Sequence, residues 1–278
     1  MREKEDQRLE KTEKIALIKK KVQGSNFNPG IAIQGASADR SLLGLLQTFL
    51  KRNGKLYYFL LNIFSPVMAS YVNRKAVRRL LGKYSPEHII LNIGSGPTYF
   101  NRREDIINVD VCKYDEVDMV SDIIDLPIED EKVDFIISIA ILEHVEKANA
   151  AVQEMFRILK PEGDVFCYVP FMVPFHGAPQ DFHRWTILGL EKLFSDFEVA
   201  EIGIGAGPTS GLLWIFQEWL AIFLSFGSRI LHDGILLILL VITMPFKFID
   251  MVLVHFPHAE KIASGFYVVA KKKRARPI

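Results

Sequence analysis

Two short apolar segments, each followed by residues suited to a ligand, constrain this chain more than any other feature. Residues 89–93 (Ile-Ile-Leu-Asn-Ile) lead into residues 94–96 (Gly-Ser-Gly), and residues 106–109 (Ile-Ile-Asn-Val) lead into Asp110. Apolar segments of this length are typical of strands buried in a parallel sheet. Glycines permit a sharp turn and a close approach of the backbone to a ligand. Ligands of open α/β sheets lie at the carboxyl ends of the strands, so we expect a nucleoside site here, with Asp110 accepting from ribose hydroxyls.

The alternation of strand and helix continues along the chain. We expect strands at residues 117–122, 133–139 and 164–169, and a helix at residues 149–159 with its apolar side chains on one face. Residues 160–163 (Lys-Pro-Glu-Gly) are expected to end that helix. Strands that alternate with helices predict an α/β fold with a doubly wound parallel sheet.

Composition narrows the class of protein. The 278 residues are 49% hydrophobic, which is ample for a core, and the net charge of +1 gives no general attraction to nucleic acid. Cys112 and Cys167 are far apart, which argues against a disulfide framework or a zinc cluster and favours buried free thiols. The N-terminus is charged rather than apolar, so we expect no secretory signal and a cytoplasmic location.

Six short motifs follow one another in order: Leu-Asn-Ile-Gly-Ser-Gly, Asn-Val-Asp, Ser-Asp-x-x-Asp-Leu-Pro, Val-Asp-Phe, Leu-Glu-His-Val and Arg-Ile-Leu-Lys-Pro-Glu-Gly. Together they resemble the class I S-adenosylmethionine-dependent methyltransferases of the type 11 group, over about residues 89–194. The resemblance implies a Rossmann-like seven-stranded sheet, six strands parallel and the last antiparallel. Residues 197–205 resemble the sixth strand, and residues 265–271 resemble the seventh, inserted beside it.

The resemblance also implies S-adenosyl-L-methionine as cofactor and assigns residues to it. Glycines 94 and 96 would bracket the methionine end, Asp110 would hold the ribose, and Asp122 would accept from the adenine amino group. The segment after the fourth strand would line the sulfonium side. The residues expected at the cofactor are Asn92, Gly94, Ser95, Gly96, Asp110, Val111, Asp122, Ile123 and Ser138.

Two departures from the family pattern bear on affinity. Asn92 stands where the family usually has an acid, and its amide oxygen accepts a hydrogen bond without carrying a charge. Tyr99 occupies the place of a third glycine, and the short segment before Asp110 implies a stunted first helix. The missing glycine also argues against a nicotinamide-dependent dehydrogenase. These departures support the alternative that the domain is a catalytically degenerate binding or scaffold protein at the membrane.

Residues 170–186, after the fifth strand, are expected to cover the acceptor side. One interpretation is structural, with Arg184 paired to Asp181 or another carboxylate and Thr186 capping a helix at residues 188–194. A second is catalytic, with His176 or His183 taking a proton from an acceptor hydroxyl. A third is a metal site of His176, Asp181 and His183, for which the sequence offers no further ligand. The catalytic candidates are therefore His144, which follows the fourth strand, His176 and His183, and we predict no metal.

The chain divides into five parts by composition: a charged, flexible segment at 1–40, a helical cap at 41–82, a methyltransferase core at 83–206 plus 263–272, a hydrophobic helical insertion at 207–262, and a basic tail at 273–278. Within the cap we expect one helix at residues 41–63 and a second from Pro66 to about Leu81. The second helix carries a cluster of four basic residues, Arg74, Lys75, Arg78 and Arg79. This cluster is either a solvated helix face, a cap over the acceptor pocket or a surface that contacts anionic lipid.

The insertion is the most unusual part of the sequence. Residues 211–226 and 234–246 are almost entirely apolar and are separated by Arg229, His232 and Asp233. Both are shorter than the roughly 20 residues that span a membrane, and the chain must return to the sheet afterwards. We therefore favour a helical pair lying in one leaflet over two full spans, and over burial against the domain or a second subunit. This predicts a membrane-associated methyltransferase that acts on a small-molecule or lipid-linked acceptor by O- or C-methylation. We expect no nucleic-acid partner, and the sequence does not specify the number of subunits.

Overall fold

A seven-stranded sheet forms the centre of the molecule. The computed structural model describes residues 2–18, 63, 65, 67–96, 103–177 and 180–274. The strand order is β3-β2-β1-β4-β5-β7-β6. Strands β1 to β6 run parallel, and β7 is antiparallel to its neighbours β5 and β6, which confirms the predicted sheet. The strands are β1 (Ile90–Ile93), β2 (Ile107–Asp110), β3 (Met119–Val120), β4 (Val133–Ile139), β5 (Leu159–Pro170), β6 (Glu198–Ala206) and β7 (Gly265–Lys271).

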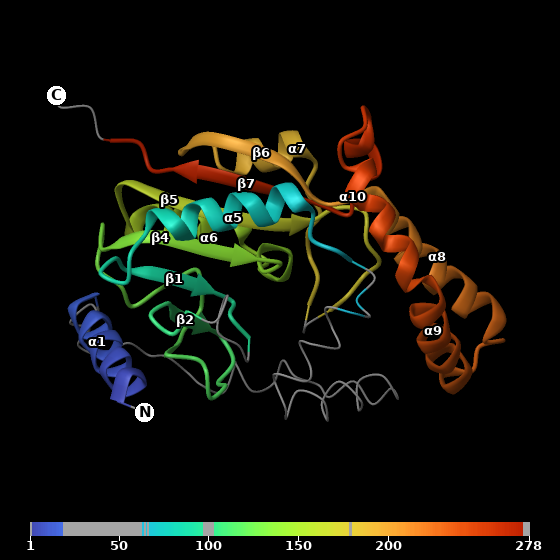
Figure 1. Ribbon diagram of the computed structural model, residues 1–278, viewed down its shortest axis with the longest axis horizontal. Coiled ribbons are helices and arrows are strands. Elements are labelled where there is room, and N and C mark those ends of the chain that lie inside the picture. The colour runs from blue at the N-terminus through green and yellow to red at the C-terminus, as the bar shows by residue number, and fades with distance from the viewer. Residues whose placement is uncertain are drawn as a thin grey trace.

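Helices cover both faces of this sheet (Figure 1). On one face α5 (Tyr71–Lys83) packs Ala76 and Leu80 against Phe135, Phe166 and Tyr267 of the sheet. The opposite face carries α6 (Ala148–Ile158) and α7 (Ile187–Leu193), whose buried side chains join the larger core. The remaining described helices are α1 (Arg2–Ile18), η2 (Leu142–His144), α8 (Pro208–Leu224), α9 (Arg229–Thr243), η3 (Met244–Ile249), α10 (Asp250–Leu253) and η4 (Ala259–Ile262).

The junction between α6 and β5 differs from the prediction. Residues 160–163 were expected to be a helix stop outside the strand, but the helix ends at Ile158 and β5 begins at Leu159. Val133 lies opposite Leu159 whereas Phe135 lies opposite Asp164, so the intervening residues bulge out of the ladder. The bulge is held because the amide of residue 162 donates to the carbonyl of Lys272 over 3.0 Å. The expected strand at 117–122 is likewise shorter, since β3 contains only two residues.

The start of α5 also differs from the prediction. The helix begins at Tyr71 rather than at Pro66, because Ser70 adopts an extended conformation and its hydroxyl accepts from the amide of Asn73 over 3.1 Å. Pro66, Tyr99, most of the expected helix at 41–63 and the last residues of the basic tail lie outside the described residues.

The insertion forms a helical hairpin, α8 and α9, that projects from the edge of the sheet (Figure 1). Arg229, His232 and Asp233 do not separate the two helices, as the sequence suggested, but belong to the first turns of α9. The helix begins there because Ser228 accepts from the amide of Leu231. His232 Nε2 lies 3.3 Å from Glu218 Oε2, which joins the hairpin. By length and composition, the helical stretch Arg229–Leu253 is long and apolar enough to cross a membrane. Of the 18 consecutive residues that meet this criterion, 22% are buried.

Candidate active site

The turn after β1 folds back over the end of β2. Gly94 has φ +70° and Gly96 has φ +57°, the left-handed conformation that glycine adopts without strain. The amides of Gly94 and Ser95 both donate to the carbonyl of Val109, over 2.7 and 3.2 Å. The glycines therefore perform the sharp turn that the sequence predicted for them.

Asp110, at the end of β2, faces this turn. Its Oδ2 accepts from the amide of Gly96 over 2.8 Å, and its Oδ1 accepts from the amide of Cys112 over 2.8 Å. The carboxylate thus lies at the carboxyl edge of the sheet, between the glycine turn and the chain leaving β2. A carboxylate in this position suits the hydroxyls of a nucleoside.

Acidic and apolar residues continue along the same edge. Val111 is 44% exposed beside Asp110. Asp122 is exposed after β3, and its Oδ1 accepts from the amide of Ile124 over 3.1 Å. Ile123 between them is buried. An acceptor beside apolar side chains is what an adenine ring with an amino group requires, so these residues fit the nucleoside end of S-adenosyl-L-methionine.

The other residues expected at the cofactor lie deeper. Asn92 is buried, and its Nδ2 donates to Oδ1 of Asn108 on the neighbouring strand over 3.1 Å. Ser138 is fully buried on β4, opposite Cys167 of β5. Ser95 is also buried, and its hydroxyl donates to the carbonyl of Gly96 over 3.2 Å. Their roles at the cofactor remain predictions.

The acceptor-side loop, residues 170–186, is tied to the segment that follows β4. The amide of Phe182 donates to the carbonyl of Glu143 over 2.7 Å. His144 Nδ1 bonds the carbonyl of Gln180, and His183 Nε2 bonds the carbonyl of Glu146 over 3.0 Å. These contacts hold the loop at the carboxyl ends of β4 and β5.

Asp181 and Arg184 give the loop an internal brace. The Arg184 guanidinium donates to both carboxylate oxygens of Asp181, and Asp181 also accepts from the amide of His176 over 2.9 Å. The hydrogen-bonded Arg184 lowers the pKa of Asp181 to about 2. Thr186 caps α7 by accepting from the amide of Gly189 over 3.1 Å. The structural interpretation of these residues agrees with the geometry.

Glu143 organises the histidines. Its side chain is fully buried, and neither carboxylate oxygen has a hydrogen-bond partner in the part of the chain that the structure describes. Its Oε1 lies 3.7 Å from His144 Nε2 and 3.8 Å from His176 Nε2. The facing Glu143 carboxylate raises the pKa of His176, although burial of the ring opposes that rise. We call Glu143, His144 and His176 the histidine cluster.

The structure therefore sorts the three catalytic candidates. His144 and His176 meet at the histidine cluster, with ring centroids 5.4 Å apart. His183 instead has its Nε2 on the carbonyl of Glu146 and its ring 5.1 Å from that of Trp185. Sequence reasoning missed Glu143, although it lies in the Leu-Glu-His-Val motif directly before His144.

The cluster also contacts the insertion. The ring of Trp214, on α8, lies 5.5 Å from the ring of His176. A Cβ atom on Gly211 would meet the carbonyl oxygen of Met172 at 2.3 Å, so α8 and the acceptor-side loop are in close contact. The apolar hairpin thus begins beside the histidines rather than at a remote surface.

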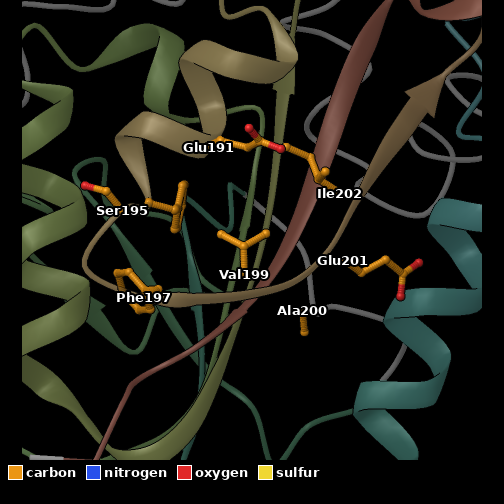
Figure 2. A pocket seen from close by; sticks show the side chains of 8 residues that line it. Glu191, Ser195, Phe197, Val199, Ala200, Glu201 and Ile202 are labelled. Carbon is orange, nitrogen blue, oxygen red and sulfur yellow. The ribbon is translucent and has the colours of Figure 1, made fainter.

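A separate hollow lies between α7 and β6 at the far edge of the sheet (Figure 2). It contains none of the expected cofactor or catalytic residues. Its lining residues are Glu191, Phe194, Ser195, Phe197, Val199, Ala200, Glu201 and Ile202. Glu201 points toward α5, where it pairs with Arg79. We assign this hollow no part in the chemistry.

Comparisons with known proteins identify part of the chain. Residues 99–167, which include Asp110, Asp122 and His144, match a family model described as a methyltransferase domain. No curated protein matches the chain.

Two solved structures are similar to the chain at low identity. Phosphoethanolamine N-methyltransferase 2 of Haemonchus contortus, in complex with S-adenosyl-L-methionine, is 15% identical, with a TM-score of 0.46 over 72% of this chain and 53% of its own. This chain therefore spans about half the length of that enzyme. The 1,6-didemethyltoxoflavin-N1-methyltransferase of Burkholderia thailandensis, with 1,6-didemethyltoxoflavin and S-adenosylhomocysteine bound, is 11% identical, with a TM-score of 0.46 over 91% of this chain and 94% of its own.

Proposed function

We propose that this chain, whose core carries a class I methyltransferase domain, transfers a methyl group from S-adenosyl-L-methionine to the head group of a lipid-linked acceptor at a membrane surface. The cofactor supplies an activated methyl group when it is bound. Asp110 would hold the ribose, the glycine turn would leave room for the methionine end, and Asp122 would accept from the adenine amino group. The Asp110 carboxylate supports this assignment because it faces the turn at Gly96.

The acceptor side would be formed by His144 and His176. Their Nε2 atoms face Glu143 at the carboxyl ends of the strands, where the loop at residues 170–186 covers them. Methyl transfer from a sulfonium depends mainly on holding the two reactants in line. The braced loop would supply that orientation, with His183 among its anchors.

The proposed membrane contact rests on the outer surface of the hairpin. Large apolar side chains on α8 and α9 are exposed, among them Trp219 at 58%, Phe223 at 66% and Ile242 at 60%. An exposed apolar surface of this extent marks a binding surface. An amphipathic helical pair buries such a face at the level of the lipid head groups.

Most charged residues of the segment from α8 to α10 are buried or half-buried. Asp233, Lys247 and Asp250 are buried, and Glu218 is half-buried beside His232. Between residues 208 and 254, Arg229 is the one exposed Asp, Glu, Lys or Arg side chain. A surface without charge costs little to place in lipid, whereas a protein-binding surface usually has a polar rim.

One observation links the membrane surface to the chemistry, namely the contact between Trp214 of α8 and His176 of the histidine cluster. A head group anchored by its lipid beside the hairpin would need to reach only a short distance to the histidines. This contact favours a lipid-linked acceptor over a freely soluble one.

Two experiments test the proposal. Calorimetry of the full chain with S-adenosyl-L-methionine should show saturable binding at one site. Absence of binding would instead support the alternative, a degenerate domain that acts as a scaffold. Flotation with vesicles of anionic and neutral lipid should carry the protein upward. Protein that stays at the bottom with both compositions would refute the membrane part.

A further inference from the structure

The histidine cluster presents an unbalanced set of charges and lone pairs. The carbonyls of Gln180 and Pro174 face the Nδ1 atoms of His144 and His176, and a carbonyl can only accept. Each carbonyl favours the tautomer with the proton on Nδ1. At His176 the Pro174 carbonyl, 3.1 Å away, is nearer to Nδ1 than Nη2 of Arg184, which lies 3.4 Å away. Both Nε2 lone pairs then face the buried carboxylate of Glu143.

This arrangement needs a positive species at its centre. A buried carboxylate without a partner is costly, and Glu143 has no hydrogen-bond partner among the described residues. The nitrogen–oxygen separations of 3.7 and 3.8 Å are too long for direct hydrogen bonds. They are close to the ~3.4 Å that separates two ligands lying about 2.1 Å from a tetrahedral zinc ion.

We propose that Glu143, His144 and His176 bind a divalent transition-metal ion such as Zn²⁺. One ligand atom from each of the three residues lies within 4.8 Å of the other two. Two imidazoles and one carboxylate form a set that such ions prefer over Mg²⁺. The carbonyls on the Nδ1 atoms orient the rings, as carbonyls commonly do for metal-binding histidines.

The role of the proposed ion depends on the proposed function, because the ion would bind the methyl acceptor. Three protein ligands would leave at least one coordination position of the ion for an acceptor. An acceptor oxygen bound there would be oriented, and its hydroxyl would ionise more readily beside the ion. This assigns Glu143 a role that the sequence did not suggest, and it departs from the prediction of no metal.

The test is zinc calorimetry on the full-length protein after treatment with chelator. Wild type should bind one Zn²⁺, and Co²⁺ should give visible absorption bands. Glu143→Gln and His176→Gln should each weaken Zn²⁺ binding at least about 100-fold, whereas the control His255→Gln, an exposed histidine outside the cluster, should bind as wild type. No saturable binding by wild type, or binding that survives both cluster substitutions, would overturn the proposal.

A second measurement separates metal binding from misfolding. In chelator, Glu143→Gln should unfold at a higher temperature than wild type, because the amide removes a buried unpaired charge. Zn²⁺ should raise the unfolding temperature of wild type but not of the variant. If a proton on His176 balances Glu143 instead, Zn²⁺ will not stabilise wild type. Binding of S-adenosyl-L-methionine, measured separately, distinguishes failure of the metal site from failure of the transferase function.

Discussion

Oδ2 of Asp110 accepts a 2.8 Å hydrogen bond from the amide of Gly96, which joins the end of β2 to the turn after β1. Through this contact one carboxylate both holds the turn and lies at the proposed ribose site. Its replacement should therefore weaken both the turn and cofactor binding.

Asp110→Ala should weaken binding of S-adenosyl-L-methionine by about 10- to 100-fold, since hydrogen bonds to a charged group contribute about 1.5–3 kcal/mol. Calorimetry measures the change. The matched control is Asp115→Ala, an exposed carboxylate shortly after β2, which should bind like wild type. Equal affinity of wild type and Asp110→Ala would contradict the assignment.

Gly94→Ala should destabilise the protein by about 1–3 kcal/mol. The residue has φ +70°, and an added Cβ would lie 2.0 Å from Cδ1 of Ile141. Urea unfolding measures the loss. Gly82→Ala, on α5 with nothing within 4 Å of the added Cβ, should instead gain about 0.5–1 kcal/mol. Similar effects at both glycines would rule out the proposed strain.

Asp250 caps α8 from a distant part of the chain. Its carboxylate accepts from the amides of Thr209 and Ser210, over 2.7 and 2.8 Å, and from the Ser210 hydroxyl. Asp250→Ala should cost about 2 kcal/mol or more in unfolding free energy, because it leaves buried donors unpaired. The N-cap hydrogen bond of α9, from the amide of Leu231 to the Ser228 hydroxyl, is longer at 3.4 Å. Its removal by Ser228→Ala should lower the unfolding free energy by about 0.5 kcal/mol. A smaller loss for Asp250→Ala than for Ser228→Ala would contradict this.

Phe223→Asp should reduce vesicle flotation by about tenfold or more. A buried Phe contributes roughly 1.5–3 kcal/mol, and a charge opposes insertion further. The control is Leu188→Asp on α7, which is 75% exposed but lies outside the insertion. Flotation that both variants lose equally would point to a general effect of charge rather than to the hairpin.

Arg184→Gln tests the brace in the acceptor-side loop through its pH dependence. Arg184 lowers the pKa of Asp181 to about 2, below the unfolded value of about 3.9. A lowered pKa adds stability above the unfolded value, and that stability is lost as the pH falls through 4 toward 2. Wild type should therefore be more stable than the variant at pH 7. This gap, the difference between their unfolding free energies, should shrink as the pH falls toward 2. Urea titrations at several pH values measure the gap, with exposed Arg78→Gln as control. A gap independent of pH would exclude this coupling.

Much of the fold follows from local pattern. Strand β4 has the bounds predicted from its apolar residues, which specify a buried strand without reference to distant contacts, and β7 has the bounds that the family resemblance implied. The start of α5 was misjudged although its Ser70 cap is local, whereas the course of β5 at residues 159–164 depended on contacts with remote residues. One is the bond from residue 162 to Lys272, which no local pattern encodes.

The candidate site divides in the same way. The glycine turn and Asp110 were predictable because each follows directly from the end of a strand, and parallel strands bring their carboxyl ends to one edge. The histidine cluster was decided only by tertiary structure. Folding of the loop back over η2 brings His176 to Glu143 and His144 and presses Trp214 against it. Sequence spacing could not predict these contacts, because an irregular loop has no fixed period that would show where its side chains point.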